Sequence, residues 1–135
     1  MRKSVEVIPT TRVNLWICFS HGLVKFAITI RGNLSFLIAE EENEGTIYFA
    51  IRGTENTDEW MDVNLRTALK KSEDLIGSFH EGFLDKAKLF PIDLPLRNIE
   101  EREIVICGHS AGGAIAAIVT IMLCEKVILY SINAN

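Results

Sequence analysis

The sequence predicts an α/β fold with a mostly parallel sheet and flanking helices. The clearest signal is a strand-type run, Glu103–Cys107 (EIVIC), which leads through a glycine-rich turn into an apolar segment, Ala114–Cys124. That segment is long enough for about three helical turns and is apolar all round, which indicates a buried helix. A second strand-type run, Lys126–Ile132 (KVILYSI), follows it. Strand, turn, helix and strand form a βαβ unit, whose strands are parallel and whose sheet is covered on both faces.

Composition places the chain among ordinary globular proteins. It has 135 residues, 48% of them hydrophobic and 24% charged, and its 14 basic and 18 acidic side chains give a net charge of −4. The length suits one domain, and the acidic balance argues against a nucleic-acid partner. No metal-ligand spacing and no nucleotide loop are present, so we expect no metal and no cofactor. We predict that Cys18, Cys107 and Cys124 are buried free thiols.

The first third of the chain is rich in β-type residues. Two apolar runs, Val13–Phe19 and Leu23–Ile30, are either short strands or a helix packed over the sheet. After them, Leu34–Ala39 and Thr46–Ile51 (TIYFAI) are compact strand-type runs separated by the acidic turn Glu40–Gly45. This pair predicts a β-hairpin in which the glycine supplies the turn conformation.

Two helices are expected between the hairpin and the βαβ unit. Asn56 or Thr57 can cap a helix that runs to about Leu69, because a short polar side chain there accepts orphan N–H bonds. A second helix is predicted from about His80 to Leu89, ended by the proline that follows. The next segment, Ile92–Arg102, is expected to be a linker.

The turn at residues 108–113 (GHSAGG) has the Gly-x-Ser-x-Gly pattern of a nucleophile elbow, between a strand and a helix as that motif requires. A serine on such a sharp turn needs small neighbours two residues away on both sides, and Gly108 and Gly112 satisfy this. Gly113 allows the helix to approach the sheet closely. Ser110 would then project at the carboxyl edge of the sheet, where the Ala111 N–H can donate to an oxyanion.

Less specific interpretations of the same residues remain open. A glycine-rich turn can carry a serine with no chemical role. His109 adjoins the serine, but neighbouring side chains on an elbow diverge, so we expect it to be structural and not a base. The segment Ile51-Arg52-Gly53-Thr54 follows a strand. It is either an ordinary strand-ending turn or the second half of an oxyanion hole, with Thr54 as the donor.

Together these motifs resemble the class 3 (fungal-type) lipases of the α/β-hydrolase fold. The resemblance covers about residues 46–130 and rests on three motifs in order: TIYFAIRGTENTDEW at 46–60, HEGF at 80–83 and IVICGHSAGGAIA at 104–116. It implies a serine esterase that hydrolyses lipid carboxylic esters through an acyl-serine intermediate. It also implies Ser110 as nucleophile, Thr54 and Ala111 as oxyanion donors, and His80 and Phe83 as packing residues.

Two departures from the family pattern bear on activity. Asp62 follows Trp60 by two positions where relatives have three, so it either supports Thr54 as a hydrogen-bond acceptor or is a solvated helix aspartate. In this fold the triad acid and histidine follow the nucleophile, yet after Ser110 the chain holds one acid, Glu125, and no histidine. We place Glu125 before the last strand, at the wrong edge of the sheet. We therefore predict that the chain by itself is inactive.

Three functions are compatible with this pattern. In the first, residues 1–135 are a single partial α/β-hydrolase domain with its motif-bearing core at 46–131, cut short after the elbow helix and the next strand and so incomplete at the C-terminus. In the second, the chain is a catalytically dead lipase-like module that binds a lipid or a protein. In the third, it is an acyltransferase of the same fold.

The expected partner is a lipid or small ester substrate, and a transient contact with a lipid interface is left open. The apolar run Ala114–Cys124 is shorter than the roughly 20 residues that span a bilayer, so no transmembrane segment is expected. No secretory signal is visible at the N-terminus. By default the sequence predicts a cytoplasmic protein, or a secreted one if the start is misassigned.

Overall fold

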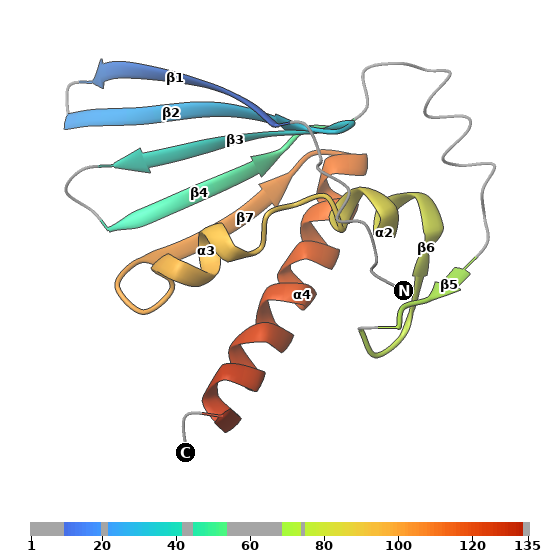
Figure 1. Cartoon of the computed structure of the whole chain (residues 1–135). Coiled ribbons are helices and arrows are strands. Elements are labelled where there is room, and N and C mark those ends of the chain that lie inside the picture. Colours follow the sequence, from blue (N-terminus) through green and yellow to red (C-terminus); the bar gives the residue numbers. More distant parts are fainter. Residues whose placement is uncertain (1–9, 20–21, 42–44, 54–68, 74, 134–135) are drawn as a thin grey trace, which may run out of the picture.

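A five-stranded sheet organises the chain (Figure 1). The computed structural model describes residues 10–19, 22–41, 45–53, 69–73 and 75–133. The strand order is β1-β2-β3-β4-β7, in which the first four strands are consecutive in sequence. The strands of this sheet span β1 Thr10–Phe19, β2 Gly22–Arg31, β3 Leu34–Glu41, β4 Thr46–Ile51 and β7 Glu103–Gly108.

The sheet is mixed, which corrects the prediction of a mostly parallel one. Strands β1 to β4 pair antiparallel, and only β7 pairs parallel, with β4. The physical reason is loop length, because short connections can join only antiparallel neighbours and a parallel pair needs a long crossover. Within the described residues only the connection from β4 to β7 is that long. The ambiguous N-terminal runs are strands, and the predicted hairpin is confirmed, with Gly45 at a φ of +71°.

Three helices and a small two-stranded sheet complete the described fold. Figure 1 shows the helices against one face of the main sheet. Their bounds are β5 Leu69–Lys71, β6 Ser78–His80, α2 Glu81–Ala87, α3 Asp93–Asn98 and α4 Ala111–Asn133. Helix α2 confirms the helix predicted from His80. Helix α3 corrects the predicted linker, since its Pro95 lies in the first turn, where no hydrogen-bonding N–H is required. The helix predicted from Asn56 or Thr57 lies outside the described residues.

Helix α4 is the largest departure from the sequence prediction. The run Lys126–Ile132 continues the helix and is not a strand, so the βαβ unit has no second strand within the described residues. No glycine or proline follows Cys124 to stop the helix, and helical hydrogen bonding simply propagates. Two hydroxyls bond back one turn: Thr120 Oγ1 to the Ala116 carbonyl at 2.8 Å and Ser131 Oγ to the Val127 carbonyl at 3.0 Å.

The added length of α4 bears on membrane interaction. With 23 residues, α4 is long and apolar enough to cross a bilayer, whereas the shorter predicted helix is not. Core helices of globular proteins can be equally long and apolar. The first part of α4 is such a core helix, with Ile115 and Val119 almost completely buried.

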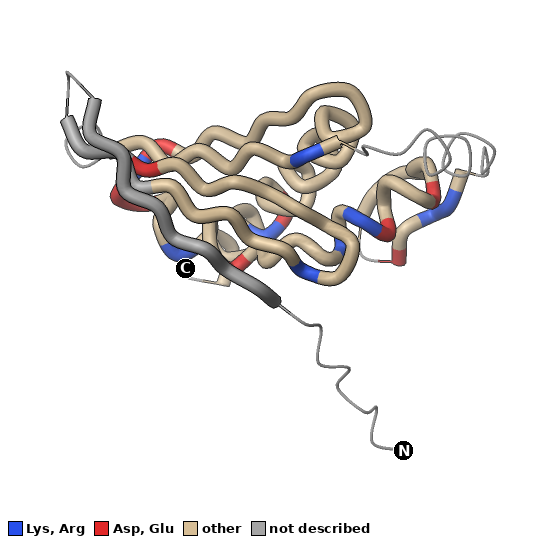
Figure 2. The backbone as a smooth tube through the Cα atoms, turned by 90° about the horizontal axis from the view of Figure 1, so that it is seen from above, with Lys and Arg blue, Asp and Glu red and all other residues tan. Residues whose placement is uncertain are grey.

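The hydrophobic core lies between the helices and the sheet. Alternate residues of β3 and β4 point into it, and the rings of Phe36 and Phe49 contact Phe90, with centroids 5.0 and 5.6 Å apart. Among the residues coloured in Figure 2, the charged ones lie toward the strand ends and on the helices. Cys107 and Cys124 are exposed, which corrects the prediction of buried thiols. The side chain of Cys18 lies outside the described part.

Candidate active site

Ser110 lies on a strained turn between β7 and α4. Its φ is +56°, and it is the only non-glycine residue with a positive φ in the described part of the chain. An L-residue in this left-handed region costs roughly 1–2 kcal/mol, so the surrounding packing must hold it there. The side chain is exposed at the carboxyl end of β7. This is the sharp, strained geometry that a nucleophile elbow requires.

Two glycines make that turn sterically feasible. A Cβ on Gly108 would lie 2.3 Å from both the carbonyl carbon and oxygen of Gly112. A Cβ on Gly112 would lie 2.3 Å from the Ile51 carbonyl oxygen, at the end of β4. All of these neighbours are backbone atoms, which cannot move aside as a flexible side chain can. The steric expectation for the two glycines is confirmed.

The backbone of the elbow packs directly against the end of strand β4. The parallel register pairs Ile51 with Gly108, and a Cβ on Gly53 would lie 3.0 Å from the His109 carbonyl oxygen and 3.9 Å from the Ala111 nitrogen. The segment after β4 therefore starts beside the first turn of α4. The sequence analysis left open whether this segment lies at the elbow or is an ordinary turn, and the structure places Gly53 at the elbow. The backbone contact between Gly112 and Ile51 was not foreseen, because the two residues are far apart in the chain. Thr54 and Asp62 lie outside the described residues.

Backbone hydrogen bonds order the first turn of α4. The Gly112 N–H donates to the His109 carbonyl at 3.0 Å, and the Gly113 N–H donates to the Ser110 carbonyl at 2.9 Å. The N–H groups of a first helical turn have no partner within the helix and carry partial positive charge. Ala111 is the first residue of the helix, and its side chain is buried. Its N–H is therefore one of the groups available to an anion at this helix end.

Comparison of the whole sequence with known protein families identifies the family to which the chain belongs. A family model described as lipase (class 3) matches residues 48–133, more than half of the chain. The chain belongs to the class 3 lipase family. No curated protein matches it significantly.

Solved lipase structures share the fold of this class 3 lipase chain. One is a fungal lipase–inhibitor complex, 24% identical with a TM-score of 0.60, matched over 70% of this chain and 38% of its own. A triacylglycerol lipase, described as having a serine protease triad, is 24% identical with a TM-score of 0.59 over the same shares. A deletion mutant of the Rhizomucor miehei lipase in its propeptide complex is 24% identical with a TM-score of 0.56, matched over 67% of this chain and 30% of its own. The chain has the α/β-hydrolase fold and spans less than two fifths of each of these chains.

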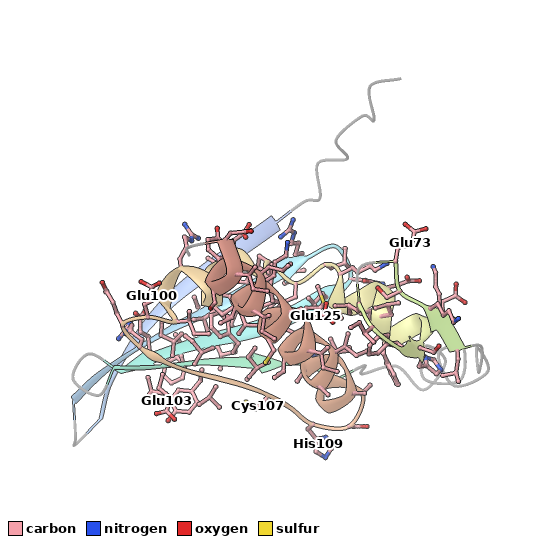
Figure 3. The ribbon with its side chains drawn as sticks, turned by 90° about the horizontal axis from the view of Figure 1, so that it is seen from below. Glu73, Glu100, Glu103, Cys107, His109 and Glu125 are labelled. Atoms are coloured by element: carbon pink, nitrogen blue, oxygen red, sulfur yellow. The ribbon has the colours of Figure 1, made fainter. Side chains whose placement is uncertain are left out.

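Among the described residues, the two histidines and Glu125 are each placed by contacts outside a catalytic triad. His109 is exposed at the outer side of the elbow (Figure 3). The His80 ring contacts the Phe83 ring, with centroids 4.6 Å apart, which confirms the expected packing. Glu125 lies on α4, which corrects its predicted place before a strand, and its Oε1 accepts the Ile76 N–H at 3.3 Å. Glu125 lies fourteen positions after Ala111 along the helix, or about 21 Å at 1.5 Å per residue.

The described residues offer no metal site, and two cavities of the described surface lie away from the elbow. No group of three or more His, Cys, Asp or Glu side chains could hold a metal ion among the described residues. An open cavity of about 980 Å³ separates α3 from the end of α4, and one of about 360 Å³ lies beside Leu75 and Met122. Ser110 lines neither cavity.

Proposed function

We propose that this class 3 lipase chain carries the nucleophile and the oxyanion donors of a serine hydrolase that acts on lipid carboxylic esters. The observation that supports this most is Ser110 held at a φ of +56° on a turn enclosed by glycines. Such strain costs stability and persists where the geometry has a use, as it has for an exposed nucleophile. Family membership supports the lipid ester as substrate class.

In this proposal the Ser110 Oγ attacks the ester carbonyl carbon and its proton passes to a base. The carbonyl oxygen becomes an oxyanion, which the N–H groups of Ala111 and Thr54 stabilise at the positive end of α4. The position of Gly53, close to the Ala111 nitrogen, supports Thr54 as the second donor. The carbon–oxygen bond then breaks, the alcohol leaves with a proton, and water hydrolyses the acyl-serine.

Residues 1–135 are proposed to perform this reaction only slowly by themselves. No histidine follows Ser110 in them, and Glu125 is held about 21 Å along α4. In a serine protease, loss of the triad lowers kcat by about a millionfold, and binding with the oxyanion hole leaves a residual rate. We expect the 135-residue chain to hydrolyse p-nitrophenyl butyrate with a kcat at or below about 10⁻³ per second.

Fluorophosphonate labelling followed by mass spectrometry tests the nucleophile. We expect slow covalent labelling of Ser110 that Ser110→Ala abolishes. Ser131→Ala is the matched control, because Ser131 is an exposed serine of the same helix, and it should leave labelling unchanged. No labelling of the unmutated chain would contradict the proposal and favour a binding module. Transfer of the acyl group to added alcohol in place of water would identify an acyltransferase.

A further inference from the structure

The smaller of the two cavities lies between helix α4, the end of helix α2 and the turn that joins β5 to β6. Its volume of about 360 Å³ is at the lower end of the range for small-molecule sites, roughly 300–1,000 Å³. Helix α2 and the β5–β6 turn lie on the side of α4 away from β7 (Figure 1). The cavity is therefore enclosed by three described elements and lies apart from the edge of the main sheet.

One face of α4 forms a wall of this cavity. Met122, Glu125, Lys126 and Leu129 line it, and their spacing of three, four and seven residues places them together on a helix surface. On the opposite wall, Leu75 comes from the β5–β6 turn. Leu75 and Met122 are partly buried and pack against the hydrophobic core. The cavity thus has an apolar floor along which a hydrocarbon chain can lie.

Two hydrogen bonds hold the β5–β6 turn in place. The Leu75 N–H donates to Ser72 Oγ at 3.1 Å, and the Ile76 N–H donates to Glu125 Oε1 at 3.3 Å. The second bond ties the turn directly to α4, on which Figure 3 labels Glu125. These bonds fix the shape of the cavity, so a ligand does not have to order the turn when it binds.

Two lysines give the cavity a positive charge. Lys88 directly follows α2 and Lys126 lies on α4, so their ammonium groups come from different walls. No salt bridge between described residues involves either lysine. Glu125 is the only acid in the described lining, and its Oε1 already accepts the Ile76 N–H. The ammonium groups are therefore available to a negatively charged ligand.

We propose that this cavity binds a free medium-chain fatty acid, with its carboxylate between Lys88 and Lys126 and its chain along Leu75 and Met122. A fatty acid combines the single negative charge and the apolar chain for which the cavity has matching surfaces. The small volume suits one acyl chain and not the three chains of a triacylglycerol. Ser110 does not line the cavity, so this inference does not rest on the proposed function.

Methyl NMR of the 135-residue chain with labelled methionine tests this proposal, using sodium decanoate below its micelle concentration as the probe. The Met122 signal is assigned by its loss in Met122→Leu. We expect it to shift saturably, with a dissociation constant on the order of 1 mM. Octanoate should bind about fivefold more weakly, because two fewer methylenes leave water. No shift of the Met122 signal at a concentration tenfold higher would overturn the proposal.

The lysines are tested with charge-matched variants. Lys88→Gln and Lys126→Gln should each weaken decanoate binding by about threefold or more. Lys71→Gln is the control, because Lys71 is an exposed lysine of β5 outside the cavity lining and its loss changes the net charge equally. It should leave the affinity unchanged. Equal weakening by Lys71→Gln and Lys126→Gln, or decanol bound as tightly as decanoate, would overturn the proposal.

Adjacent residues of α4 test the apolar wall. Leu129→Asn should weaken decanoate binding by about threefold or more, because it removes apolar contact with the chain. Ile128→Asn should have no effect, since Ile128 is similarly exposed, 58% against 55%, but lies outside the cavity lining. Circular dichroism verifies that both variants fold. Loss of binding in Ile128→Asn but not in Leu129→Asn would contradict the assigned wall.

Ser110→Ala separates this proposal from the proposed function. The variant should bind decanoate as tightly as the unmutated chain, although it loses fluorophosphonate labelling. Loss of the Met122 shift in Ser110→Ala would mean that decanoate binds at the elbow, and would overturn the cavity as its site. Failure of labelling in the unmutated chain would leave decanoate binding unaffected.

Discussion

The two parts of helix α4 both carry large apolar side chains, but they lie in opposite environments. Residues 111–123 contain all the buried positions of the helix, including Ile115, Val119 and Leu123. Residues 124–133 include two charged residues and also several large apolar ones, of which Ile128, Leu129 and Tyr130 are all more than half exposed. The first part has β4, β7 and α2 to pack against, whereas the second extends past the described sheet. Apolar residues are therefore buried only where neighbouring elements pack against them, whatever the hydrophobicity of their own segment.

The largest effect is expected where the first part of α4 meets the sheet. In Gly112→Val the new Cβ would lie 2.3 Å from the Ile51 carbonyl oxygen, so the helix and strand must separate. We expect a loss of more than about 3 kcal/mol in the free energy of unfolding, measured by urea denaturation. The control is Gly45→Ala, where a Cβ meets nothing within 4 Å and only the positive φ is unfavourable. It should cost about 1 kcal/mol. Equal losses in the two variants would contradict the contact.

A matched pair of leucines measures the contrast along α4 directly. Leu123 is 5% exposed and Leu129 is 55% exposed. We expect Leu123→Ala to lower the free energy of unfolding by about 2–4 kcal/mol, because it removes buried apolar surface and leaves a cavity. Leu129→Ala should change it by less than about 0.5 kcal/mol, as is usual for an exposed site. Urea denaturation compares both. A large effect of Leu129→Ala would mean that the second part of α4 is covered in solution.

The smallest effect is expected at the elbow and has the opposite sign. Ser110→Gly removes the Cβ that makes a φ of +56° unfavourable, while the added freedom of glycine in the unfolded chain offsets part of the gain. We expect a net stabilisation of about 0.5–1 kcal/mol. Ser110→Ala keeps the Cβ and should give no such gain. Thermal unfolding of both variants measures the difference, and equal stability would show that the elbow stores no strain.

Several features could be predicted from the sequence because their causes are local. The strand Thr46–Ile51 was bounded correctly, since alternation and the glycine before it act within a few residues. The elbow was also predictable, because Gly108 and Gly112 have a fixed spacing from Ser110 and a strand lies before them. The same holds for the helix after His80, which ends before a proline. In each case the residues that decide the structure are themselves neighbours in the chain.

Other features depended on contacts that no local pattern contains. The run Lys126–Ile132 has residues typical of a strand, yet it is helical, because a strand needs a partner whereas a helix that is already formed can continue. The mixed sheet followed from which strands are adjacent in space. By itself, the sequence determined the family, the order of the motifs and the elbow serine. Only the tertiary structure decided that Gly112 rests on the Ile51 carbonyl, that large apolar residues in the second part of α4 are exposed, and that the described helices all lie against one face of the sheet.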